Sequence, residues 1–113
     1  MDYINKIELK GRVGTVRSNV VNDSKVCNFS LVTEFLYKSR EGNPMSETTW
    51  FNIVAWEGRD ILDMNKIEKG ATVHVTGRIR SSKYEGSDGT ERHMQEVLAS
   101  KLRVIEDSTD DPR

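Results

Sequence analysis

Residues 50–56 (WFNIVAW) alternate between two kinds of side chain, and this run constrains the fold more than any other segment. Successive side chains of a β-strand point to opposite faces, so Trp50 and Trp56 share a face with Asn52 and Val54. The odd-numbered residues are apolar and suited to a core. A soluble protein seldom exposes two tryptophans on one face unless something binds there. The run therefore predicts a strand with a packing face and an aromatic face, the latter for nucleic-acid bases, a sugar or another protein.

The rest of the chain predicts further strands separated by turn-forming segments. Gly11 and Gly14 interrupt the first strand where it could bend sharply around a small barrel. The polar residues 18–25 predict a loop, residues 39–47 with Gly, Asn and Pro predict a mobile hairpin loop, and residues 85–90 predict a turn. The predicted strands are 4–16, 26–33, 48–56, 71–80 and a last segment through 94–105; the predicted connections are 18–25, 39–47 and 85–90.

Residues 59–67 change period, because apolar side chains recur there at helical spacing before Gly70, a typical stop. Three strands, a helix and two strands is the element order of the OB-fold. At 113 residues the chain suits one domain. We therefore predict an all-β, five-stranded OB-fold barrel with one short helix between strands 3 and 4. It occupies residues 1–105, and a short acidic disordered tail occupies residues 106–113.

Composition limits the chemistry of the chain. The formal net charge is −1, but residues 1–105 hold 16 basic and 14 acidic residues, a mild positive bias that permits nucleic-acid binding. The single cysteine, Cys27, excludes an internal disulfide and a multi-cysteine zinc site, and it predicts a buried thiol. No apolar run has the length of a membrane span or signal sequence, so we expect a cytoplasmic protein without a membrane partner. No metal or cofactor is expected.

Aromatic side chains outside the predicted core have cations close by in sequence. Lys38 follows Tyr37, and Lys83 precedes Tyr84. The same register places Arg78 and Arg80 on the face of Tyr84, and Arg59 follows Trp56. Aromatic rings among dispersed cations suit single-stranded nucleic acid, whose bases stack on rings irrespective of sequence. Each residue alone has an ordinary structural explanation, as a core tryptophan, a half-buried tyrosine or a solvated arginine. The prediction rests on their arrangement.

Several ordered segments resemble bacterial single-stranded DNA-binding proteins over residues 4–105. They are the Asn-Lys opening and Gly-x-x-Gly of residues 5–14, residues 28–33 (NFSLVT), residues 48–56 with their Thr-x-Trp, and the later blocks 68–70, 73–79 and 83–84.

The resemblance implies sequence-independent binding and protection of single-stranded DNA in replication, recombination and repair, by homotetramers of OB folds. Carried over by motif, the four stacking positions fall on Tyr37, Trp50, Trp56 and Tyr84. The phosphate-contacting positions fall on Lys6, Lys69, Arg80 and Lys83, to which the register argument adds Lys38, Arg59 and Arg78. Two departures are Phe51, where the family often has a polar residue, and residues 109–113, which lack the terminal aromatic. Recruitment of repair enzymes through a C-terminal tip is therefore not expected.

Two other classes of function compete with DNA coating. A primosome-type OB-fold adaptor, which mainly binds proteins, shares the barrel but depends less on aromatic platforms. An enzyme is the weakest alternative, because His74 and His93 are the only histidines and no nucleophile–base pairing or Gly-rich phosphate loop is evident. We predict a binding protein without a catalytic step.

Overall fold

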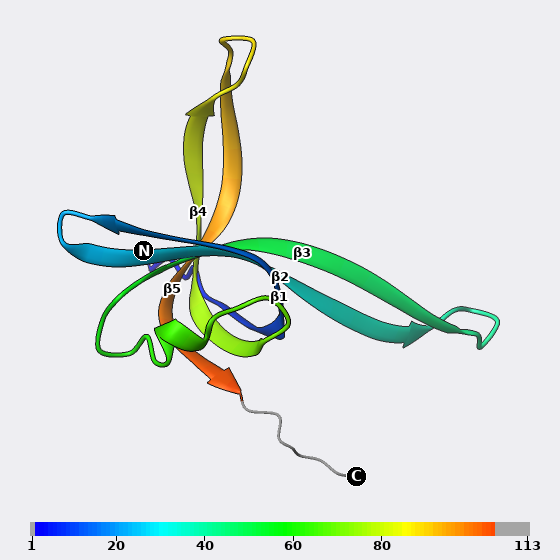
Figure 1. Ribbon diagram of the computed structural model, residues 1–113. Coiled ribbons are helices and arrows are strands. Elements are labelled where there is room, and N and C mark those ends of the chain that lie inside the picture. The colour runs from blue at the N-terminus through cyan, green and yellow to red at the C-terminus, as the bar shows by residue number, and fades with distance from the viewer. Residues whose placement is uncertain (1, 106–113) are drawn as a thin grey trace.

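The computed structural model describes residues 2–105, which form a closed barrel with the strand order β1-β2-β3-β5-β4 (Figure 1). Neighbouring strands are antiparallel, except that β3 and β5 pair in parallel over two residues each. The predicted five-stranded OB-fold is confirmed, and the predicted acidic tail lies outside the described residues. The strands are β1 (Ile7–Val21), β2 (Ser24–Lys38), β3 (Pro44–Trp56), β4 (Thr72–Glu85) and β5 (Glu91–Ile105).

Strand β1 bends where its glycines predict. Its first part pairs with β4 and its second part with β2, and Arg12 has a partner in both. A Cβ on Gly11 would overlap the carbonyl oxygen of Val32, so only glycine allows β2 to approach this closely. The register with β2 shifts between Val13 and Val16, as expected of a strand that turns a barrel corner.

Three hairpins extend the strands beyond the barrel as arms (Figure 1). The predicted loop at 18–25 is wrong, because β1 and β2 continue to a tight turn at Asn22 and Asp23, both with positive φ. The predicted loop at 39–47 shrinks to residues 39–43, because β3 already begins at Pro44. The sequence pattern did not reveal these parts of the strands, because a strand is recognised by one apolar face and here polar side chains occur on both faces.

The single helical element between β3 and β4 is shorter than predicted. Only Met64–Lys66 form a 3-10 helix, directly after Asp63 in a left-handed conformation. The backbone before it bonds to β5 instead: the N–H of Leu62 donates to the carbonyl of Leu102 (2.8 Å). That pairing holds the segment extended. The apolar residues of 59–67 therefore pack against the barrel without forming the apolar face of a helix.

The core lies inside the barrel and takes buried residues from every strand. It includes Cys27, as predicted, and burial raises the pKa of that thiol against the opposing effect of a hydrogen bond with Ser18. Within residues 2–105, no helix is long and apolar enough to span a bilayer. The core residues are Val13, Cys27, Phe29, Leu31, Ile53, Ala55, Ile67, Val73, Val75, Val97 and Leu102.

Candidate nucleic-acid interface

Strand β3 shows the predicted alternation. Ile53 and Ala55 are buried and Phe51 packs against the core, whereas Trp50 and Trp56 are 59% and 38% exposed. Val54 is the exception, because it shares the outward register with the tryptophans and is nevertheless buried. The outer face of β3 therefore carries two large exposed rings, six residues apart along the strand, with the smaller side chains of Asn52 and Val54 between them.

The Trp50 ring is positioned by a glycine. An ideal Cβ on Gly14 would lie 2.8 Å from Cζ3 of Trp50 and 2.6 Å from Oγ of Ser30. On another side, Ile79 and Gln95 of the β4–β5 hairpin line a hollow with Trp50. The ring is thus seated between β1 and the hairpin while most of its surface stays open to a ligand.

A polar groove on the same face was missed by sequence reasoning. Its lining includes Arg17, Asn28, Ser30 and Asn52, together with Glu96 of β5. Ser30 Oγ accepts a hydrogen bond from the backbone N–H of Thr15 (2.9 Å). Only the strand register could have revealed the groove, because Arg17 pairs with Asn28 and Ser30 pairs with Asn52 across three strands. Amides, hydroxyls and one guanidinium beside exposed tryptophans can hold the sugar–phosphate side of a nucleotide.

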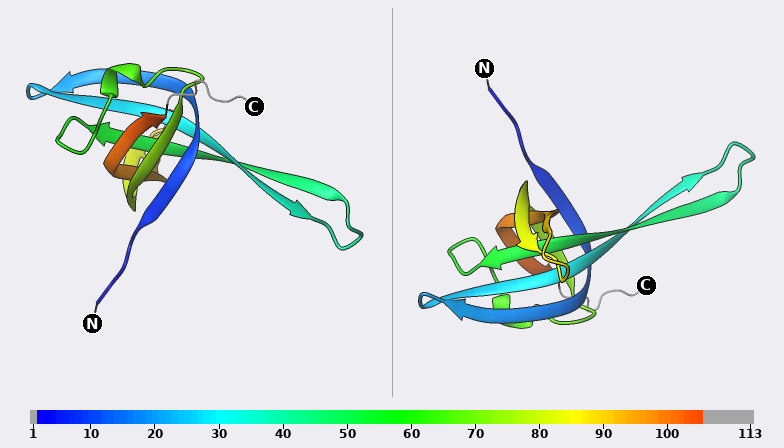
Figure 2. Two further views of the ribbon diagram at one scale, coloured as in Figure 1. Left: turned by 90° about the horizontal axis from the view of Figure 1, so that it is seen from below. Right: turned by 90° about the horizontal axis from the view of Figure 1, so that it is seen from above.

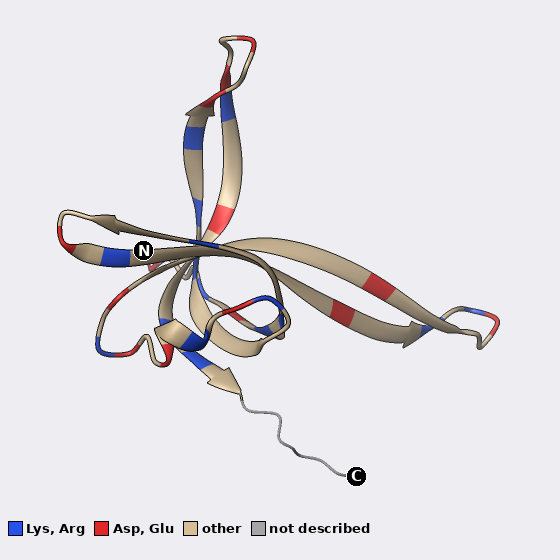
Figure 3. Cartoon of the chain, in the orientation of Figure 1, with Lys and Arg blue, Asp and Glu red and all other residues tan. Residues whose placement is uncertain are grey.

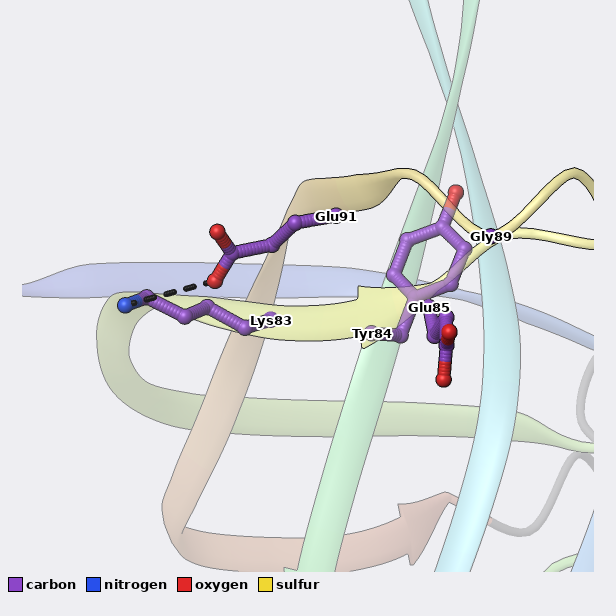
Figure 4. Close-up of a pocket in the computed structure, with 5 residues that line it drawn as sticks. All are labelled: Lys83, Tyr84, Glu85, Gly89 and Glu91. Carbon is purple, nitrogen blue, oxygen red and sulfur yellow. Dashed lines mark ion pairs between the residues drawn. The ribbon is translucent and has the colours of Figure 1, made fainter.

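The β4–β5 arm (residues 80–96) carries three of the predicted residues, and two of them have acidic partners. Arg80 Nε donates to Oε2 of Glu96 at 2.8 Å. Lys83 lies 3.5 Å from a carboxylate oxygen of Glu91, and Figure 4 shows its side chain turned toward that partner, whereas the Tyr84 ring stands by the turn near Gly89. The arm therefore presents an exposed ring, but its cations are partly neutralised.

The predicted Tyr37 lies on a different surface from Trp50. In the β2–β3 pairing, Trp50 is opposite Val32 and Tyr37 is opposite Met45, an odd number of residues further along, so the two rings occupy opposite pleat faces. The neighbour of the Tyr37 ring is Phe35 instead, with centroids 6.2 Å apart and planes inclined by 23°.

The predicted cations are spread over several places and do not form one stripe. Lys6 and Arg78 line one hollow together with Lys101, which the sequence did not suggest. Asn5 fixes this segment, because its side chain donates to the Ile79 carbonyl (2.7 Å) and accepts from the Ile79 N–H (3.0 Å). Figure 3 shows basic and acidic segments interspersed on all three arms.

The three remaining cations lie apart from that hollow. Lys38 ends β2, and Arg59 belongs to the connection after β3. Lys69 precedes Gly70, whose N–H donates to the Val13 carbonyl (2.9 Å), and so lies at the bend of β1.

Comparisons with known proteins identify the family of this chain. The single-strand binding protein family model matches residues 4–105. The single-stranded DNA-binding protein of Neisseria meningitidis serogroup A is 34% identical over 105 residues, which cover 90% of this chain and 60% of the relative. That of Xanthomonas campestris is 29% identical over 104 residues, with the same coverage of both chains.

Among solved structures, an SSB of Plasmodium falciparum in complex with ssDNA superposes with a TM-score of 0.79 at 28% identity, covering 94% of this chain and 98% of that one. The chain spans about 60% of the length of the curated relatives it matches first. The family model covers nearly the whole barrel, from before β1 to the end of β5. As its sequence resemblance predicts, the chain belongs to the single-strand binding protein family.

Proposed function

We propose that this protein binds and protects single-stranded DNA without sequence preference. The observation that carries the proposal is the outer face of β3, where Trp50 and Trp56 are both exposed beside a polar groove. Every base has a π-face, so exposed rings bind any sequence, whereas a duplex offers no free base faces. The names of the relatives, and the ssDNA bound in the Plasmodium structure, support the same ligand.

Stacking rather than charge supplies most of the affinity in this proposal. Each stacked base contributes about 1–3 kcal/mol, so Tyr37, Trp50, Trp56 and Tyr84 together offer about 4–12 kcal/mol before the strand is ordered. The basic excess of residues 1–105 is small, and Arg80 and Lys83 already have acidic partners. Phosphate contacts by Lys6, Lys38, Arg59, Lys69 and Arg78 then orient the strand and set its salt dependence.

The protein acts by binding and release, with no catalytic step, in DNA replication, recombination and repair in the cytoplasm. We expect a homo-oligomer, with a tetramer as the expected state, on the basis of the family resemblance. Light scattering with and without oligo-dT measures that state directly.

Replacing both tryptophans tests the proposed stacking. We expect Trp50→Ala combined with Trp56→Ala to weaken oligo-dT binding by roughly 2–6 kcal/mol, because two platforms are lost. Anisotropy of labelled oligo-dT is the suitable measurement, since the variant lacks tryptophan fluorescence. Tyr3→Ala is the matched control, because Tyr3 is an exposed aromatic outside the proposed site. If the double variant binds as the wild type does, the stacking assignment is wrong.

The same titration separates DNA coating from the adaptor alternative. A DNA-coating protein binds oligo-dT at micromolar or lower concentration, and its tryptophan fluorescence is quenched. A duplex of the same length binds far more weakly. An adaptor that mainly contacts proteins would bind neither ligand at those concentrations.

A further inference from the structure

The β2–β3 arm (residues 33–49) exposes an apolar strip on one pleat face. It consists of Phe35, Tyr37 and Met45, and Met45 lies directly opposite Tyr37. All three side chains are exposed, and Phe35 is the most open at 66%. The two rings are nearly parallel, with centroids 6.2 Å apart, which is close to the spacing of alternate residues along a strand. A pair of open, aligned rings is suited to flat ligands rather than to a core.

Phe35 lies between two of the rings already assigned to DNA. Glu47 is its partner on β3, three residues from Trp50, whereas the partner of Tyr37 is five residues from Trp50. At the rise of a strand these separations are roughly 10 Å and 17 Å. The second distance is several times the roughly 3.4 Å between stacked bases on one strand. A DNA strand that runs from Trp50 to Tyr37 therefore carries bases past the position of Phe35.

We propose that Phe35 is a fifth base-stacking platform, which with Tyr37 extends the single-stranded DNA site along the β2–β3 arm. The inference rests on the proposed function, since it assigns a further residue to the same ligand. Two-stranded ribbons twist strongly, and Figure 2 shows β2 and β3 crossing in projection as the arm leaves the barrel. Phe35 and Trp50 lie on opposite pleat faces, and this twist turns the Phe35 face, toward the tip, to the side on which Trp50 lies at the base of the arm. A DNA strand that leaves Trp50 without winding around the arm therefore meets Phe35, whereas the Leu36 face turns away from it.

Charge on the arm indicates stacking as the mode of binding there. Lys38 and Arg40 are outnumbered by three glutamates, Glu34, Glu41 and Glu47. Glu47 lies directly opposite Phe35 on the same pleat face. A phosphate at this point gains little from the arm, whereas a base on the Phe35 ring needs no cation. Loss of Phe35 should therefore lower affinity without changing its salt dependence.

The first experiment measures oligo-dT binding by fluorescence titration at several salt concentrations for the wild type, Phe35→Ala, Phe35→Leu and Leu36→Ala. We expect Phe35→Ala and Phe35→Leu to bind roughly 5- to 140-fold more weakly, the range that corresponds to one lost stacked base. The slope of log affinity against log salt should stay unchanged. Leu36→Ala is the matched control, because Leu36 is an exposed neighbour on the opposite pleat face, and it should bind as the wild type does. Thermal unfolding of each variant verifies that the arm and barrel are intact.

A second experiment places a reporter on the strip. In a Trp50→Phe, Trp56→Phe background, Phe35→Trp makes residue 35 the sole tryptophan, and oligo-dT should quench its fluorescence. Leu36→Trp in the same background should show little quenching.

Four outcomes overturn the inference. They are wild-type affinity of Phe35→Ala, full rescue by Phe35→Leu, an equal loss in Leu36→Ala, and an unquenched reporter at residue 35. A changed mass in light scattering at unchanged oligo-dT affinity would assign the strip to contact with a second copy instead. Failure of the wild type itself to bind oligo-dT would overturn the proposed function together with this inference.

Discussion

At the residue scale, small side chains beside the β3 face matter as much as the rings themselves. Gly14 is followed by an otherwise ordinary strand, and the sequence predicts only a bend there. In the structure, the Trp50 ring also packs against Gly14, in space that a Cβ would fill. The sequence could predict which rings face outward, because that depends on strand period alone. It could not predict what lies beneath each ring, because that depends on a second strand.

Gly14→Ala should weaken single-stranded DNA binding by up to the roughly 1–3 kcal/mol of one stacked base. The new methyl group would lie 2.8 Å from the Trp50 ring, so the exposed ring must move. Fluorescence titration with oligo-dT measures the effect. Gly58→Ala is the control, because its Cβ would meet nothing closer than the Trp56 carbonyl oxygen at 3.8 Å. Equal affinity of Gly14→Ala and Gly58→Ala would contradict the positioning role.

At the scale of elements, the arms differ most from what the sequence predicts. The strands extend into both predicted loops, leaving only a two-residue turn in 18–25 and a five-residue loop in 39–47, and the predicted helix is reduced to three residues. On the β4–β5 arm, cross-strand pairing also sets the strength of the predicted phosphate contacts. Arg80 and Glu96 are directly opposite each other, and the Glu96 side chain is only 11% exposed. A partly buried carboxylate thus competes with phosphate for this guanidinium, which only the register reveals.

Glu96→Gln should raise the affinity for oligo-dT, because it removes the negative charge that Arg80 now neutralises. The slope of log affinity against log salt should steepen by about 0.7, the value of one added single-strand phosphate contact. Titrations over a range of salt concentrations measure both quantities. Glu91→Gln is the matched control, since its pair with Lys83 is longer and solvent-exposed, and a smaller change is expected there. An unchanged slope in Glu96→Gln would mean that Arg80 stabilises the arm and does not contact DNA.

At the scale of the whole molecule, the barrel closes through a short seam. Strands β3 and β5 pair at Ile53 with Val97 and at Val54 with Leu98. Ile53 is buried at this seam and also pairs with Phe29 of β2, so it joins three strands. Only 35% of the residues are hydrophobic, so the core is thin, and each buried residue accounts for a large share of the marginal stability of a small domain.

Ile53→Ala should lower the free energy of unfolding by about 2–5 kcal/mol, since it leaves a cavity where the strands close. Urea denaturation followed by circular dichroism measures this loss. Ile4→Ala provides the same chemical change at a position that is 91% exposed, where the shift should stay within about 0.5 kcal/mol. Similar losses of unfolding free energy for both variants would show that Ile53 at the seam contributes no more to barrel stability than an exposed isoleucine does.

The sequence by itself determined the order of the strands along the chain, the outward direction of Trp50 and Trp56, the burial of Cys27 and the family. These follow from local periodicity and from ordered motifs, which are properties of short segments. Only the tertiary structure decided that the missing Cβ of Gly14 leaves room for the Trp50 ring, that Glu96 pairs with Arg80, and that Met45 lies opposite Tyr37 on an extended arm. The physical reason is that register, twist and barrel closure join residues far apart in the chain, and alternation within one strand carries no information about its neighbours.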